Sequence, residues 1–175
     1  MTSLQYPIGQ YEPTSERSEQ QLKEWIGVLE DIPKQLKEAT KHLTKAQLDT
    51  PYRPEGWTIR QVVHHMADTH MNAYLRFKIA ITEEAPHIRP FDQQRFAELP
   101  DSKAPIEISL QLIDILHAKW VLLLEGMNDS DFEKTYYHPV YQKTIALYHA
   151  TGMYVWHSKH HLAHITELKK RSGWS

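Results

Sequence analysis

The chain has 175 residues, 41% of them hydrophobic and 24% charged, and its formal net charge is -2 with neutral histidines. This length suits one domain spanning residues 1–175, and without a basic excess we expect no nucleic-acid partner. No segment approaches the roughly 20 apolar residues that span a bilayer, and the first residues lack the apolar core of a signal peptide. We therefore expect no membrane partner and a cytoplasmic location.

The N-terminal part of the sequence predicts an irregular arm followed by a long helix. Pro and Gly residues mark the arm over residues 1–15, and apolar residues then recur at three- and four-residue steps over residues 16–43. Pro33 lies inside this helical pattern, so we expect a kink or a break there. Thr44 should cap a short helical turn over residues 45–49.

A second long helix should begin at Thr58, because Thr58 and Gln61 have the spacing of a capping box. The pattern continues to about Thr82 and stops before the next proline. Residues 84–105 contain four prolines and predict a long connection with a short helical turn near residues 92–99.

A third helix is predicted over residues 106–125, with Gly126 as its end. Its expected buried stripe consists of Ile108, Leu112, Ile115, Leu116, Trp120 and Leu123. A second connection spans residues 128–143, and Thr144 is the expected cap of a fourth helix over residues 145–170. Strand signals are weak throughout, so four long helices with two long connections predict an all-α four-helix bundle.

The last predicted helix holds an unusual cluster of histidines. The chain has 12 histidines and no cysteine, so any transition metal must be held by nitrogen and oxygen ligands. Four histidines fall within eight residues, and residues four apart lie on the same face of a helix. His157 with His161, and His160 with His164, therefore each have the spacing of a ligand pair for a divalent metal.

Helical phase narrows the choice on the second helix. At roughly 100° per residue, one stripe contains His65 at its centre, whereas His64 falls nearly opposite, toward solvent or a partner. The stripe consists of Val62, His65, Met66, Thr69, Ala73, Phe77 and Ala80. The expected core face of this helix thus carries one histidine.

On the last helix the same calculation puts His157, His161 and His164 on the inner stripe and His160 at its edge. Burying several imidazoles is costly unless their nitrogens are paired, and a shared metal would pair one nitrogen of each. We therefore expect a metal site formed by His65, His157 and His161. His164 is either an alternative ligand or a residue that contacts the ligands.

Other polar residues near these stripes are weaker candidates. Thr69 and Asn72, together with His164, could orient a ligand or a water, and an ordinary role as polar residues of the bundle fits them equally well. Arg76, at the edge of the inner stripe, could bind an anionic group of a substrate or take part in a structural ion pair. No carboxylate lies in phase with His65, so the sequence identifies no general base and no catalytic residue.

Two segments carry a resemblance to a known family. GWTIRQVVHHMADTHMNAYLRFK and YVWHSKHHLAHITEL resemble the DinB/YfiT-like metal-dependent hydrolases, and YPIGQYEP and LDTPYRPEGW resemble the YfiT branch. The resemblance covers nearly the whole chain. It implies a four-helix bundle in a cytoplasmic homodimer, with one zinc or nickel ion per chain held by three histidines. The family's ligand eight residues after the Trp of the GW motif matches His65, and its H-x-x-x-H pair matches His157 and His161.

Three histidine ligands leave open positions on a metal, as in catalytic zinc sites, where a bound water of lowered pKa can attack an electrophile. We therefore expect a metal-dependent hydrolase of a small-molecule substrate. The resemblance also leaves open an S-transferase that uses a low-molecular-weight thiol such as bacillithiol. A third interpretation is a non-catalytic, stress-associated metal-binding bundle.

Overall fold

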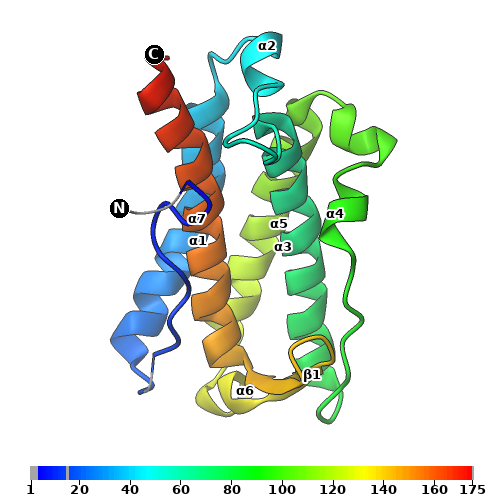
Figure 1. Ribbon diagram of the computed structural model, residues 1–175. Coiled ribbons are helices and arrows are strands. Elements are labelled where there is room, and N and C mark those ends of the chain that lie inside the picture. Colours follow the sequence, from blue (N-terminus) through cyan, green and yellow to red (C-terminus); the bar gives the residue numbers. More distant parts are fainter. Residues whose placement is uncertain (1–3, 15, 175) are drawn as a thin grey trace.

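The protein is a bundle of four long helices, as the computed structural model shows for residues 4–14 and 16–174 (Figure 1). The four helices are α1 (Glu19–Thr40), α3 (Ile59–Thr82), α5 (Ile106–Gly126) and α7 (Leu147–Ser172). The predicted all-α four-helix bundle is therefore confirmed. No helix within the described ranges is long and apolar enough to cross a membrane.

The helices do not simply alternate in direction. In Figure 1, α1 and α7 run upward, whereas the consecutive helices α3 and α5 both run downward. The chain therefore needs a long return between them, and residues 83–105 pass back along α3. This segment contains the predicted helical turn, α4 (Gln93–Phe96), and a 3-10 helix (Pro100–Lys103) that the sequence pattern missed.

Side-chain caps fix the start of the helices around the upper end of the bundle. Thr44 and Gln47 form a capping box for the short helix α2 (Lys45–Leu48). Thr58 and Gln61 form another at the first turn of α3, as predicted. Each box pairs two backbone N–H groups that would otherwise lack an acceptor, so the start of α3, and with it the phase of its histidines, is defined locally.

Of the kink or break expected at Pro33, the break does not occur: α1 continues through this residue to Thr40. A proline inside a helix removes one backbone hydrogen bond. Burial of the surrounding face, which includes Leu29, Ile32 and Leu36 at 0–1% exposure, offsets that loss. The helix also ends at Thr40, earlier than expected.

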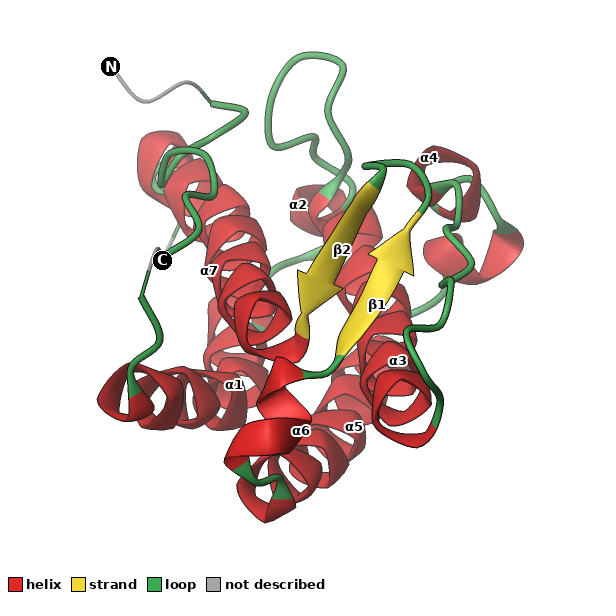
Figure 2. Cartoon of the chain, turned by 90° about the horizontal axis from the view of Figure 1, so that it is seen from below, coloured by secondary structure: helices red, strands yellow, loops and turns green. Residues whose placement is uncertain are grey.

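The second connection contains structure that the sequence pattern did not predict. A short helix α6 (Asp129–Glu133) precedes the antiparallel strands β1 (Thr135–His138) and β2 (Lys143–Ala146). Figure 2 shows this hairpin lying across the lower end of the bundle. Thr144, the expected cap of the last helix, lies in β2, and α7 begins instead after Ala146 without a side-chain cap. Strands of four residues are too short to give a clear period-two pattern.

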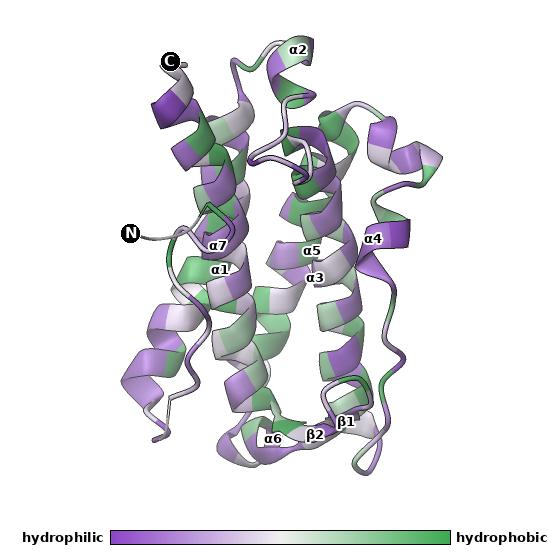
Figure 3. Cartoon of the chain, in the orientation of Figure 1, coloured by the Kyte–Doolittle hydropathy of each residue, from purple (hydrophilic) through white to green (hydrophobic). Residues whose placement is uncertain are grey.

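The predicted buried stripe of α5 is half wrong: Leu116 and Trp120 are buried and Leu123 is partly buried, but the other three residues are exposed. Ile108 and Ile115 are 61% and 65% exposed, and Leu112 is also exposed. The buried residues are instead Ile106, Ser109, Ile113, Leu116, His117, Trp120, Val121 and Leu124. Apolar residues lie on both the exposed and the buried side of this helix, so hydrophobic periodicity does not define its inward face. Figure 3 shows hydrophobic residues along all four long helices.

The N-terminal arm lies against α7. Over the described part of the arm, Tyr11 donates its hydroxyl hydrogen to the carbonyl of His149 at 3.2 Å, and the Trp156 indole donates to the carbonyl of Gly9 at 3.3 Å. Residues 1–3 and 15 of the predicted arm lie outside the described residues. The arm thus covers the outer side of the helix that carries the histidine cluster (Figure 1).

Candidate metal centre

Three histidines from two helices converge inside the bundle. His65 comes from α3, and His157 and His161 come from consecutive turns of α7. One nitrogen of each lies within 4.8 Å of the others, and the Nε2 atoms of His65 and His157 are 3.2 Å apart. Zn–N bonds of 2.0–2.1 Å in tetrahedral geometry place two nitrogens about 3.3 Å apart. The donor set and its spacing therefore fit a shared divalent ion.

The two helices bury this cluster but leave one side open. His65 and His161 are 4% and 6% exposed, whereas His157 retains partial exposure. No carboxylate completes the triplet anywhere in the described chain. The arrangement therefore offers three neutral ligands, of which His157 is the least buried.

Burial keeps these imidazoles neutral. Desolvation, together with the neighbouring His160 and His164, lowers the pKa of His65 to about 4. Desolvation is also the main reason why the pKa values of His157 and His161 lie well below the ordinary value for histidine. A neutral imidazole has a free lone pair for a metal, so the cluster is ready to bind at neutral pH.

A second histidine triplet shares His161 with the first. His160, His161 and His164 also bring one nitrogen each within 4.8 Å. His160 is buried, not at an exposed edge, because its ring stacks on Trp156 at 4.6 Å and lies 5.7 Å from the ring of Tyr6 in the arm. Geometry alone therefore offers two overlapping triplets.

His164 has partners on both of its nitrogens. Its Nε2 lies 3.1 Å from the carbonyl oxygen of Gln5, and its Nδ1 lies 3.3 Å from Nδ1 of His161. Its ring also stacks on Tyr52 at 3.8 Å. The predicted contact between His164 and the candidate ligands is therefore present in the structure.

The weaker candidates of α3 have different surroundings. Thr69 Oγ1 lies 3.5 Å from Nδ1 of His65. Asn72 donates to the carbonyl of Asp68 in its own helix at 2.8 Å, and therefore does not point at the histidines. Arg76 is buried and donates from Nη1 to the Tyr154 hydroxyl at 3.0 Å.

Arg76 and Asn72 line a groove of about 580 Å³ between α3 and the return segment. His87, Arg89 and Asp92 from the return segment also line it. Two arginines against one aspartate give the groove a positive balance, which suits a ligand that carries a negative group.

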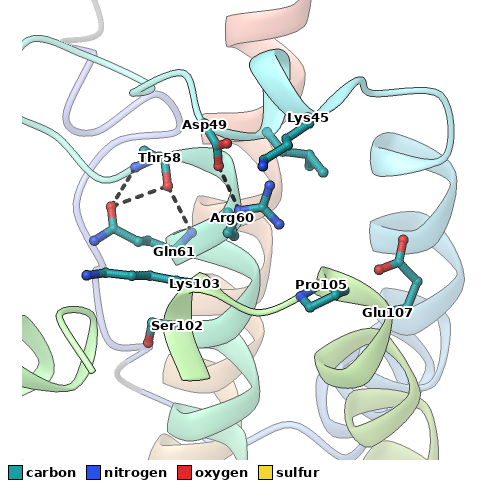
Figure 4. Close-up of a pocket in the computed structure, with 10 residues that line it drawn as sticks. Lys45, Asp49, Thr58, Arg60, Gln61, Ser102, Lys103, Pro105 and Glu107 are labelled. Carbon is teal, nitrogen blue, oxygen red and sulfur yellow. Dashed lines mark hydrogen bonds and ion pairs between the residues drawn. The ribbon is translucent and has the colours of Figure 1, made fainter. Parts of the chain in front are cut away.

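A different pocket, of about 810 Å³, lies at the upper end of the bundle (Figure 4). It is lined by the start of α3 and by α2, and Arg60 there forms an ion pair with Asp49 at 2.7 Å. None of the three converging histidines lines this pocket. Its larger volume therefore does not make it the candidate metal centre.

His64 does not face solvent or a partner, contrary to the prediction from helical phase. It is 6% exposed, and its Nδ1 and Nε2 lie 2.7 Å from Ser109 Oγ and 3.0 Å from the Ala104 carbonyl oxygen. The return segment and α5 cover this side of α3, and a helical-wheel calculation for one helix cannot anticipate that cover.

The sequence pattern missed two further histidines near the cluster. His70 of α3 and His117 of α5 are 0% and 1% exposed, and burial lowers the pKa of each. His70 Nε2 lies 3.3 Å from Nδ1 of His157. The only signal in the sequence was that each of these histidines lies within an apolar helical segment.

Comparisons with known proteins identify relatives that cover nearly the whole chain. A family model described as the DinB superfamily matches residues 28–165. The chain is 63% identical to "Putative metal-dependent hydrolase" of Bacillus pumilus (strain SAFR-032) and 53% identical to "Putative metal-dependent hydrolase YfiT" of Bacillus subtilis (strain 168), over 100% of each chain. The solved structure of YfiT from Bacillus subtilis, described as having "an unusual four-helix bundle topology", matches with a TM-score of 0.96 and 53% identity. That match covers 98% of this chain and 99% of the other.

Proposed function

This chain belongs to the DinB superfamily, and we propose that it is a metal-dependent hydrolase whose divalent ion is held by His65, His157 and His161. The observation that carries the proposal is the convergence of three neutral imidazoles, two buried and one partly buried, with Nε2 of His65 and Nε2 of His157 only 3.2 Å apart. Two hydrolase-named relatives with full-length similarity support the same class.

Zinc or nickel, one ion per chain, suits this donor set, because imidazole is a good ligand for both metals. Such an ion would act as a Lewis acid and lower the pKa of a water at an open position. The partial exposure of His157 supports entry of a small-molecule substrate from that side.

One neighbouring residue helps to orient a ligand. His164 donates from Nε2 to the Gln5 carbonyl, so its bare Nδ1 can accept the Nδ1–H of His161. His161 then presents a bare Nε2 to the ion. Thr69 Oγ1 lies 3.5 Å from Nδ1 and 3.4 Å from Nε2 of His65, so it does not select between the two nitrogens of that ring.

The groove beside α3 is lined by none of the three converging histidines, so we assign to it only a distal, charged part of the substrate and not the bond that reacts. Arg76 and Arg89 would attract an anionic group there, which favours esters, amides or phosphoesters that carry a negative charge. Asn72 lines the same groove and contributes a polar wall.

The test compares metal-loaded and metal-stripped protein on a panel of such esters, amides and phosphoesters in ¹⁸O-labelled water. We expect metal-dependent turnover that places the label in the product, and we expect its loss in His65→Ala. His42→Ala, at an exposed histidine, is the matched control and should retain full turnover. Equal turnover by stripped protein or by His65→Ala would contradict the proposal.

The same panel, repeated with bacillithiol or another low-molecular-weight thiol, separates the alternatives. A product that contains the thiol and no label would replace the hydrolase with an S-transferase. Tight metal binding without turnover of any substrate under either condition would favour a non-catalytic metal-binding bundle.

A further inference from the structure

A row of histidines leads from the candidate metal centre through the whole bundle. His157 Nδ1 lies 3.3 Å from His70 Nε2, and His70 Nδ1 lies 2.8 Å from His117 Nε2. His117 Nδ1 lies 2.5 Å from the carbonyl oxygen of Leu29. The four residues come from α7, α3, α5 and α1, so each long helix contributes one group.

The direction of every hydrogen bond in this row follows from its last member. A carbonyl oxygen only accepts, so His117 must carry its hydrogen on Nδ1 and has a bare Nε2. His70 must then donate from Nδ1, which leaves its Nε2 bare. That atom in turn accepts from Nδ1 of His157. A neutral His157 therefore has a bare Nε2, the atom that lies 3.2 Å from Nε2 of His65.

This assignment requires His70 and His117 to be neutral. Both are almost fully buried, and no carboxylate is among their hydrogen-bond partners, so the charged form is disfavoured. Ser158 Oγ also lies 3.4 Å from His70 Nε2, but Ser158 donates its hydrogen to the Tyr154 carbonyl at 2.7 Å. Ser158 therefore leaves the bare Nε2 of His70 to His157.

The sequence also explains why a helical carbonyl is free to end the row. In an α-helix the carbonyl of residue 29 accepts from the N–H of residue 33. Residue 33 is Pro33, which lies inside α1 and has no N–H. The Leu29 carbonyl thus lacks its usual donor, and His117 supplies one.

We propose that His70 and His117 are positioning residues that hold His157 in the tautomer with hydrogen on Nδ1 and Nε2 presented to the metal. The proposal rests on the proposed function, since it takes His157 to be a ligand. Without the row, either nitrogen of His157 could carry the hydrogen, and part of the metal-binding free energy would be spent on selecting the tautomer and ring orientation.

The experiment combines metal affinity with direct observation of the tautomer. His117→Phe keeps a planar ring but cannot transmit the hydrogen bond, whereas His117→Gln retains an N–H and a carbonyl that can bridge Leu29 and His70. We expect His117→Phe to weaken zinc binding about 10- to 100-fold, measured by chelator competition, and His117→Gln to recover most of that loss. His42 is exposed and is not part of the row, so His42→Ala should bind zinc normally.

Long-range ¹H–¹⁵N NMR of the wild-type protein provides a second measurement that does not depend on a variant's folding. We expect His70, His117 and His157 to carry hydrogen on Nδ1 both with and without zinc, and His157 to become a mixture of tautomers in His117→Phe. Hydrogen on Nε2 of His157 in the metal-free wild type would overturn the proposal. So would zinc binding by folded His117→Phe as tight as in the wild type.

These outcomes separate the inference from the proposed function. If wild-type protein binds no metal, or if His65→Ala binds it normally, the proposed metal centre fails. If wild-type protein binds metal through His65 while His117→Phe leaves affinity and tautomer unchanged, only the role of the row fails.

Discussion

The carbonyl oxygen of Leu29 lies 2.5 Å from Nδ1 of His117, and it is available because Pro33 supplies no N–H four residues later. Proline ordinarily destabilises the interior of a helix, but here Pro33 leaves the Leu29 carbonyl free to accept a hydrogen bond at the centre of the bundle. The sequence feature that predicted a break in α1 is instead connected, through His117 and His70, to the candidate metal centre.

Pro33→Ala should therefore move stability and metal affinity in opposite directions. Alanine is about 3 kcal/mol more favourable than proline inside a helix, so we expect a higher unfolding temperature. Its N–H would compete with His117 for the Leu29 carbonyl and weaken zinc binding, by less than His117→Phe does because a carbonyl has two lone pairs. Pro54→Ala, in an exposed loop, is the control for both measurements. A stabilised Pro33→Ala with unchanged zinc affinity would show that the hydrogen bond from His117 to the Leu29 carbonyl does not contribute to metal binding.

Purified protein should contain about one divalent ion per chain, zinc or nickel, because both triplets of imidazoles that meet at the spacing of a shared ion include His161. Elemental analysis after mild purification, followed by titration of stripped protein, measures this. His65→Ala removes one of three ligands and should abolish tight binding. If the protein takes up no metal, the proposed metal site is wrong. If His65→Ala retains the metal, the ligands are other residues.

The two overlapping triplets on α7 predict different results for single alanine variants. We expect His157→Ala and His161→Ala to abolish tight binding and His160→Ala to retain it. His164→Ala should weaken binding about tenfold, because it removes the acceptor 3.3 Å from His161 Nδ1 but no ligand. Parallel metal titrations of the four variants decide the matter. Loss of metal in His160→Ala with retention in His157→Ala would identify the other triplet as the site.

Metal-free protein should lose stability as the pH falls below about 6.5. Burial lowers the native pKa values of His65, His160 and His164 to about 4, whereas an unfolded histidine has a pKa of about 6.5. Between these two pKa values the unfolded state binds more protons than the native state. Each such histidine reduces the unfolding free energy by at most about 1.4 kcal/mol per pH unit in that window, and partial solvation of His160 and His164 makes their share smaller. Asp68, whose pKa burial raises to about 6, opposes the trend, but as a single group it is outnumbered by the histidines.

Denaturant titrations from pH 7 to pH 5 measure this slope. His160→Ala should make it shallower, and the exposed His42→Ala should leave it unchanged. A free energy of unfolding that does not vary over this range would contradict the depressed pKa values.

The converging histidines could be predicted from sequence because their geometry is mostly local. The capping box at Thr58 defines the start of α3, and the four-residue spacing of His157 and His161 survives any packing of the bundle. His70 and His117 could not be found in this way. Their contact depends on α3 and α5 lying side by side in parallel, which follows from the long return of residues 83–105 and not from any local pattern.

The inward face of α5 could not be predicted for a related reason. An amphipathic helix reveals its buried side by contrast between apolar and polar residues. In α5 the outward side is also apolar, with Ile108, Ile115 and Leu122 at 61%, 65% and 70% exposure. The β-hairpin was missed because pairing between β1 and β2, and not a period-two sequence, defines those strands.

The same exposed side of α5 leads to the last prediction, on association. Ile108, Ile115 and Leu122 lie seven residues apart in sequence and therefore along one face of the helix. A contiguous apolar face in water is typical of a protein interface, and the family resemblance implies a homodimer. We propose that this face contacts the same face of a second copy. His64 takes no part in it, because it is buried within its own chain.

Light scattering at tens of micromolar should therefore give a mass of twice 20.6 kDa for the wild type. The double variant Ile108→Glu, Ile115→Glu places two carboxylates in the contact, where desolvation and repulsion across the symmetry axis disfavour association, and it should be monomeric while still binding metal. Val140→Glu is the matched control, since Val140 is equally exposed, at 65%, but lies in the turn of the hairpin. A monomeric wild type would exclude the dimer, and a dimeric double variant would place the interface on another surface.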